Sequence, residues 1–137
     1  MSDKSKRDAL THRIQFGGDE VVEAKAGTGS ATLSMAQAGA EFADKVIRAA
    51  FKGESGLSAP SYVNLDADAS AAKTIRQEIG KDLEYFSVVV DLGKEGVAKL
   101  NPVGKLDDVE VELLKKAVED LEPSINKGVS FKPAAKL

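Results

Sequence analysis

The sequence has no cysteine, a single histidine and no long apolar run. Without cysteine the chain forms neither disulfides nor thiolate metal sites, which is typical of proteins from a reducing compartment. Its apolar runs are far shorter than the roughly 20 residues that a membrane-spanning helix needs. The first nine residues are polar and lack the apolar core of a secretory signal. We therefore predict no disulfide, no metal site and no membrane partner.

The charge balance lacks a basic excess. The 19 basic and 22 acidic residues are interspersed and give a net charge of −3, so no basic face is available for a phosphate backbone. Nucleic acid is therefore not an expected partner. With 42% hydrophobic and 30% charged residues, the 137-residue chain has an ordinary soluble composition and is long enough to bury a core.

Glycines divide the first half of the chain into helical segments. Residues Asp8–Lys25 are typical of two short helices broken at Gly17-Gly18, with Asp19 capping the second. After a second break at Gly27 and Gly29, a helix is expected from Ser30 to about Lys52, ended by Gly53. Its apolar positions are small and follow helical spacing, with two larger flanking side chains; they are Ala36, Ala40, Ala43, Ile47 and Ala50, flanked by Phe42 and Phe51.

The pattern then changes to short strands. Ser61–Leu65 and Tyr85–Leu92 are expected strands, the second rich in β-branched and aromatic residues. A turn at residues 93–96 joins the second strand to Val97–Asn101, which predicts an antiparallel hairpin.

The last expected helix begins with a capping box formed by Asp107 and Glu110 and is ended by Gly128. Pro123 predicts either a kink near Asp120 or a break into two helices. One apolar face repeats at intervals of three or four residues, through Val111, Leu114, Val118, Leu121 and Ile125. The fold class is therefore α+β, with three principal helices packed on a small, largely antiparallel sheet.

The glycine-rich stretch A-G-T-G-S is not a phosphate-binding loop. It lacks the G-x-x-x-x-G-K-[ST] pattern, and no strand precedes it as in a dinucleotide fingerprint. Independent nucleotide binding is not expected.

Four blocks carry a resemblance to a known family. Asp8–Ala36 (D-A-L-T-H-R-I-Q-F-G-G-D-E-V-V-E-A-K-A-G-T-G-S-A-T-L-S-M-A), Ser58–Leu65, Tyr85–Gly96 and Ile125–Phe131 resemble NAD-dependent malate dehydrogenases of the mitochondrial or peroxisomal type. The resemblance implies a polar segment 1–9, a malate dehydrogenase C-terminal domain 10–131 and a tail 132–137. Val89 departs from the family, in which many members have proline at that position.

The resemblance and local propensity disagree over Ala67–Lys81. Propensity favours a helix within Ala71–Glu78, whereas the family resemblance implies only a strand and a loop.

The resemblance also implies an activity, the interconversion of malate and oxaloacetate with NAD by a homodimer. The catalytic histidine, its aspartate and the substrate-binding arginines of that family precede the matched stretch, as does the glycine-rich fingerprint. We therefore expect no catalytic residue in this chain, which would be a truncated or fragmentary C-terminal half and inactive alone.

The segment Gly27–Met35 is the expected site. By resemblance, Ser30 and Ala31 form a wall of the substrate pocket and Met35 contacts the cofactor; spacing alone indicates only a helix-start turn and a core methionine.

The remaining charged and titratable residues have simpler interpretations. His12 is expected to be a solvated helix residue, and the carboxylate pairs Asp19-Glu20 and Asp107-Asp108 to favour helix starts. The arginines are expected to be surface or dimer-contact charges; they are Arg7, Arg13, Arg48 and Arg76.

Two other functions remain open. One is a non-catalytic module that pairs with full-length subunits; the other is a domain of the lactate dehydrogenase class. The ending Ala135-Lys136-Leu137 is a variant of the peroxisomal S-K-L address, with the mitochondrial matrix or the cytoplasm as alternatives.

Overall fold

The computed structural model describes residues 3–29 and 32–132. The chain divides into two compact units, Met1–Ala43 (the N-terminal unit) and Asp44–Leu137 (the C-terminal unit). The described residues contain five α-helices, one 3-10 helix and a three-stranded sheet, in agreement with the predicted α+β class.

The N-terminal unit begins with two short helices, α1 (Lys4–Gln15) and α2 (Gly17–Ala24). The Asp3 side chain caps α1 by accepting a hydrogen bond from the Lys6 amide at 3.3 Å. The break lies at Phe16, just before the predicted Gly17-Gly18 pair. The prediction that Asp19 caps α2 is wrong: Phe16 is the N-cap residue, and Asp19 lies in the first turn. Neither helix contains a buried residue.

The long helix α3 (Thr32–Lys52) starts in the N-terminal unit and ends in the C-terminal one. Residues 33–43 are all exposed, including Ala36, Ala40 and Ala43 of the predicted small-residue stripe. In the C-terminal unit the packed side of α3 consists of Val46 and Ala49, while Ile47 is 48% exposed. Ile47 of the predicted stripe therefore lies outside the face of α3 that packs in the C-terminal unit. The predicted end of the helix is confirmed, because Gly53 adopts φ 65° directly after Lys52.

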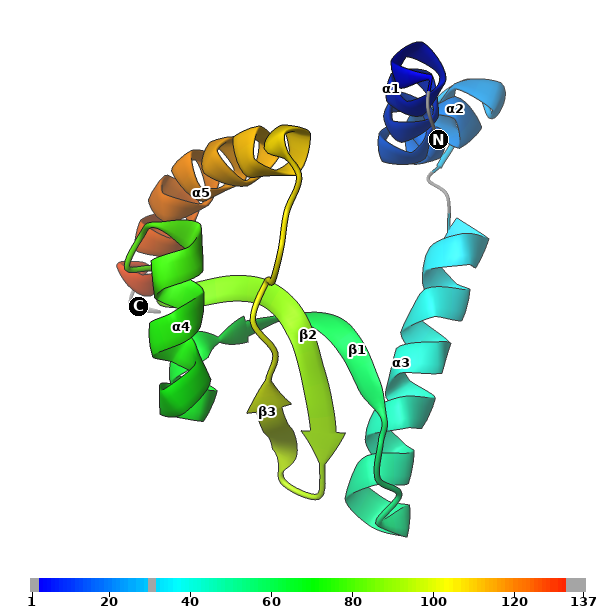
Figure 1. Cartoon of the computed structure of the whole chain (residues 1–137). Coiled ribbons are helices and arrows are strands. Elements are labelled where there is room, and N and C mark those ends of the chain that lie inside the picture. Colours follow the sequence, from blue (N-terminus) through cyan, green and yellow to red (C-terminus); the bar gives the residue numbers. More distant parts are fainter. Residues whose placement is uncertain (1–2, 30–31, 133–137) are drawn as a thin grey trace. The chain divides into compact units, whose positions relative to one another are not determined.

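The sheet consists of β1 (Ser58–Asn64), β2 (Tyr85–Gly93) and β3 (Gly96–Leu100), in that order and antiparallel throughout (Figure 1). The predicted hairpin is confirmed, and β1 begins three residues before the predicted Ser61. Along β2 burial alternates, with every even-numbered residue from Phe86 to Leu92 buried. This period of two places one side of β2 in the core.

The open edge of β1 is unusual. The Leu57 carbonyl accepts from the Leu92 amide and the Leu65 amide donates to the Glu84 carbonyl, so odd-numbered residues direct their backbone groups toward β2. Ser58 and Pro60 therefore direct theirs to the open edge. Pro60 has no amide hydrogen there, and the Ser58 carbonyl accepts from Lys45 Nζ at 3.1 Å.

Between β1 and β2 the chain forms η1, a 3-10 helix (Leu65–Asp68), and α4 (Ala69–Ile79). The helix favoured by propensity is therefore correct, and the strand-and-loop interpretation is wrong. Asp68 caps α4 by accepting from the Ala71 amide at 3.2 Å, and Gly80 ends the helix with φ 70°. The buried face of α4 repeats at helical intervals, through Ala72, Ile75 and Ile79.

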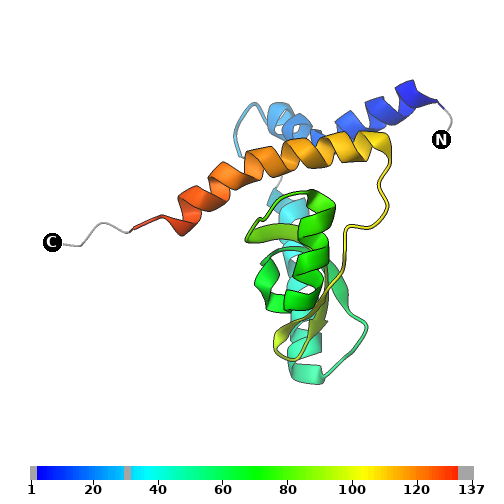
Figure 2. The ribbon, with the colours of Figure 1, turned by 60° about the vertical axis from the view of Figure 1, so that its left-hand side comes forward.

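Helix α5 (Asp108–Val129) has the predicted capping box between Asp107 and Glu110. It runs through Pro123 without interruption, so the predicted break into two helices is wrong; Figure 2 shows one continuous helix. The predicted end at Gly128 is also wrong, because the helix continues to Val129. The predicted apolar face is confirmed, with Val118 and Ile125 buried.

The core lies entirely in the C-terminal unit. Leu65, Ile75 and Leu100 have no exposed surface, and Val90 is 1% exposed. The core joins one side of the sheet to helices α3, α4 and α5; its buried members are Ala49, Leu65, Ala72, Ile75, Ile79, Leu83, Phe86, Val88, Val90, Leu92, Leu100, Val118 and Ile125.

Candidate functional site

The approach to the predicted site is a turn with left-handed backbone at three residues. Ala26, Gly27 and Gly29 have φ values of 51°, 74° and 116°. The Gly27 amide donates to the Val22 carbonyl at 3.0 Å, and Thr28 Oγ1 donates to the Lys25 carbonyl at 2.6 Å. Left-handed backbone is strained for residues with a Cβ, which explains why two of these three positions in the turn are glycine.

The beginning of α3 is exposed. Met35 lies in its first turn and a half with 69% of its surface exposed, so the alternative interpretation of Met35 as a core residue is wrong for this chain. The predicted pocket residues Ser30 and Ala31 lie outside the described residues. The first turn of α3 has no acidic residue, so no side chain of that turn neutralises the positive end of the helix dipole.

His12 is a surface residue of α1, as predicted. Its ring is exposed and contacts the Phe16 ring, with the centroids 4.6 Å apart and the planes tilted by 41°. Aromatic packing of this kind does not orient an imidazole for proton transfer.

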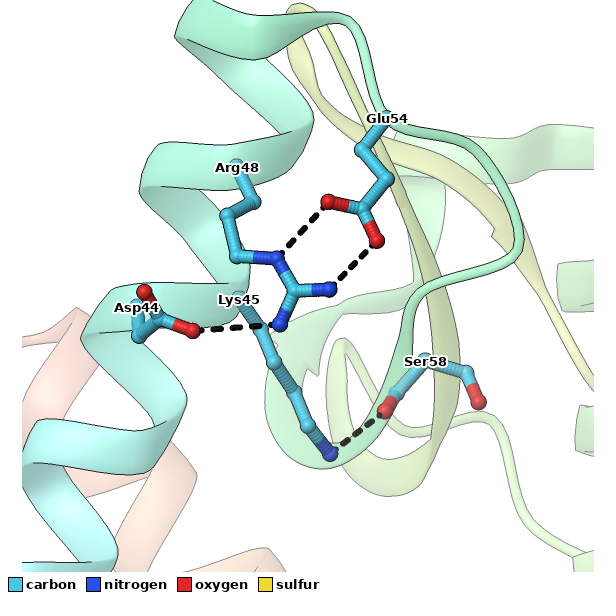
Figure 3. Close-up of polar contacts among 5 residues, drawn as sticks. All are labelled: Asp44, Lys45, Arg48, Glu54 and Ser58. Atoms are coloured by element: carbon cyan, nitrogen blue, oxygen red, sulfur yellow. Dashed lines mark hydrogen bonds and ion pairs between the residues drawn. The ribbon is translucent and has the colours of Figure 1, made fainter.

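Arg48 is held by carboxylates at the end of α3 (Figure 3). Its guanidinium donates two hydrogen bonds to Glu54, one of them from Nε at 2.7 Å, and a third to Asp44 at 3.2 Å. By accepting these hydrogen bonds, the Glu54 and Asp44 carboxylates raise the pKa of Arg48 further above its ordinary value. The hydrogen bonds from Arg48 in turn lower the pKa of Glu54. A guanidinium occupied on both sides is a structural clasp, not a ligand for a substrate carboxylate.

Arg13 and Arg76 also pair with acidic side chains of this chain. Arg76 pairs with Asp66 at 2.9 Å and with Asp82 at 3.0 Å, and its Nε donates to the Leu83 carbonyl at 3.1 Å. Arg13 pairs with Glu20 at 3.6 Å. The prediction that these are surface charges is confirmed for Arg13, which is exposed, whereas Arg76 is half-buried and ties α4 to the loop after it.

The carboxylate pairs occupy helix starts, as predicted. Asp19 and Glu20 lie in the first turn of α2, and Asp107 caps α5 with Asp108 in the first turn. Over the described ranges, no group of three His, Cys, Asp or Glu side chains could hold a metal ion. No helix in the described part of the chain is long and apolar enough to cross a membrane.

The sequence did not reveal an apolar groove in the C-terminal unit. The groove, called here the β2–α5 groove, has a volume of about 500 Å³ and lies between β2, the segment 101–106 and the first half of α5. Val89 and Leu113 line it with 45% and 46% of their surfaces exposed. No motif marks the groove, because its mostly apolar walls come from separate elements.

Comparison with known proteins places these features in a family. The family model described as lactate/malate dehydrogenase, alpha/beta C-terminal domain, matches residues 1–132. The mitochondrial malate dehydrogenase of Schizosaccharomyces pombe is 51% identical over 126 residues, covering 92% of this chain and 34% of the relative. That of Saccharomyces cerevisiae is 49% identical over 131 residues, covering 96% of this chain and 36% of the relative. The glyoxysomal malate dehydrogenase of Cucumis sativus is 42% identical over 122 residues, covering 89% of this chain and 30% of the relative.

The chain spans about a third of the length of the relatives it matches. Within that third, the match runs through the glycine turn, the exposed start of α3, the sheet and α5. The chain therefore belongs to the lactate/malate dehydrogenase family, as a representative of its alpha/beta C-terminal domain.

Proposed function

We propose that this chain is the substrate-binding and dimer-forming part of an NAD-dependent malate dehydrogenase, which interconverts malate and oxaloacetate. The domain responsible is the segment 10–131, preceded by a polar segment 1–9 and followed by a tail 132–137. The observation that carries the proposal is the exposed start of α3 after the glycine turn, within a chain about half identical to two mitochondrial malate dehydrogenases.

In this proposal Met35 forms a wall for the nicotinamide ring. A thioether side chain is soft, apolar and adaptable, and it excludes water from a flat ring placed against it. Its 69% exposure leaves it available for such a contact. Ser30 and Ala31 form the neighbouring wall of the substrate pocket, where small side chains permit close approach.

The cofactor NAD fits this role of the chain only in part. When bound, NAD supplies the acceptor for the hydride that leaves C2 of malate. The residues at the start of α3 provide an apolar wall, and the first turn has no acidic residue to compete with an anionic group for the positive end of the helix dipole. The proton of the malate hydroxyl needs a base held by a partner, and the single histidine of these 137 residues packs against Phe16. We therefore expect the isolated chain to have no turnover.

A chimera tests the proposal. The 126 residues of the Schizosaccharomyces pombe relative that match this chain are replaced by the corresponding residues of this chain, and malate-dependent NADH formation is measured. We expect turnover from the chimera and none from the isolated 137 residues. A folded chimera, judged by circular dichroism, that oxidises lactate but not malate assigns the chain to the lactate dehydrogenase class; one that oxidises neither contradicts the proposal.

The role of Met35 is tested in the same chimera. Met35→Lys places a charge against the nicotinamide, so we expect the KM for NAD to rise about tenfold or more, while Met35→Leu retains an apolar wall. Leu33→Lys is the matched control, because Leu33 lies in the same part of α3 and is 88% exposed. Equal effects of the two lysine variants would remove the assignment of Met35.

The dimer is proposed to form through the exposed part of α3. Its residues 33–43 are exposed, and the small residues Ala36, Gly39, Ala40 and Ala43 permit close approach of another helix. Phe42, 40% exposed, supplies an aromatic anchor beside them. Met35 and this stripe lie on the same helix, so one element would carry both the subunit contact and the cofactor contact.

The compartment is proposed to be the peroxisome, with the mitochondrial matrix as the alternative. The proposal is supported by the tripeptide Ala135-Lys136-Leu137, which lies outside the described residues, and by relatives named as mitochondrial and glyoxysomal enzymes. A fluorescent protein ending in residues 126–137 should enter peroxisomes and should lose that location when Leu137 is deleted. A diffuse signal from the intact fusion would contradict the proposal.

A further inference from the structure

We draw no further inference here: the strongest candidate, the apolar β2–α5 groove of the C-terminal unit, is an unpartnered surface, and nothing in the structure shows what covers it.

Discussion

Arg48 and Glu54 are joined across the end of α3 by both backbone and side-chain hydrogen bonds. The Glu54 amide donates to the Arg48 carbonyl at 3.1 Å, and the Arg48 guanidinium donates two hydrogen bonds to the Glu54 carboxylate. Together with the left-handed Gly53 between them, these bonds fix the path of the chain from the helix toward β1.

Removing this clasp should lower thermal stability. Arg48→Gln removes the paired hydrogen bonds to Glu54 and the bond to Asp44, so we expect the Tm to fall by a few degrees in a thermal unfolding experiment. Lys115→Gln is the control, because Lys115 forms a single exposed pair with Glu112 and should change the Tm less. A larger decrease for Lys115→Gln would contradict the clasp.

The clasp should also depend on pH. Arg48 holds the pKa of Glu54 below its ordinary value of 4.5, so the folded state binds this proton less tightly than the unfolded state. The stability contributed by Glu54 is therefore fully present well above pH 4.5 and is lost as the pH falls through the folded pKa. The difference in Tm between wild type and Arg48→Gln should be largest near neutral pH and narrow in acid. A constant difference down to pH 3 would exclude this linkage.

Truncation of the core should be costly at Leu65, which, like Ile75 and Leu100, has no exposed surface. Leu65→Ala removes buried methyl groups and leaves a cavity, so we expect the free energy of unfolding to fall by about 2–5 kcal/mol in urea. Phe51→Ala removes a larger side chain that is 84% exposed and should change the free energy of unfolding by less than about 0.5 kcal/mol. Similar values for the two variants would show that burial at Leu65 has been misjudged.

At the start of α5 the contribution of the capping hydrogen bonds can be measured apart from that of the attraction to the helix dipole. Asp107 Oδ1 accepts from the Val109 and Glu110 amides at 2.9 Å each, whereas Asp108 lies in the first turn. Asp107→Ala should reduce the free energy of unfolding by about 0.5–2 kcal/mol. Asp108→Ala should cost less, about 0.3–1 kcal/mol, because only attraction to the dipole is lost. The order of the two values checks the assignment of the cap.

Pro123 should be a position at which stability can be gained. Because α5 continues through Pro123, the helix lacks the amide that would donate to the carbonyl four residues earlier. Pro123→Ala restores that donor, and we expect a gain of up to about 3 kcal/mol in urea unfolding. Loss of stability would show that the ring of Pro123 makes contacts that outweigh the missing hydrogen bond.

Self-association should respond to a charge on the exposed part of α3. Ala40→Arg adds a long cation between small residues, so sedimentation equilibrium should show a weaker dimer, and Lys52→Ala at the far end of α3 should not. A monomeric wild-type chain that does not bind the dye ANS would contradict a dimer through this face.

Local chemistry accounts for the parts of the fold that the sequence predicted correctly. The hairpin between β2 and β3 and the cap at Asp107 depend on residues close in the chain, so their signals are complete within a short window. The same holds for α4, where local helix propensity within Ala71–Glu78 was a better guide than the resemblance.

The errors arose where distant residues decide. The buried side of α3 depends on the residues of the sheet and the other helices; Val46 and Ala49 make that contact, and the spacing of the predicted stripe did not mark them. Pro123 predicted either a kink near Asp120 or a break into two helices; the helix is unbroken, and buried contacts at Val118 and Ile125 on either side of Pro123 favour one helix. At the candidate site, the exposure of Met35 could not be obtained from spacing, because helical periodicity does not say which apolar residues have a packing partner.

The open edge of β1 has a consequence for behaviour at high concentration. Pro60 presents no donor there, and Lys45 already occupies the Ser58 carbonyl, so a strand from another molecule would find two of the edge positions unable to pair. Edge strands without such features act as templates for aggregation. Concentrated solutions of this chain should therefore resist β-type fibril growth from β1, even where helical surfaces hold molecules together.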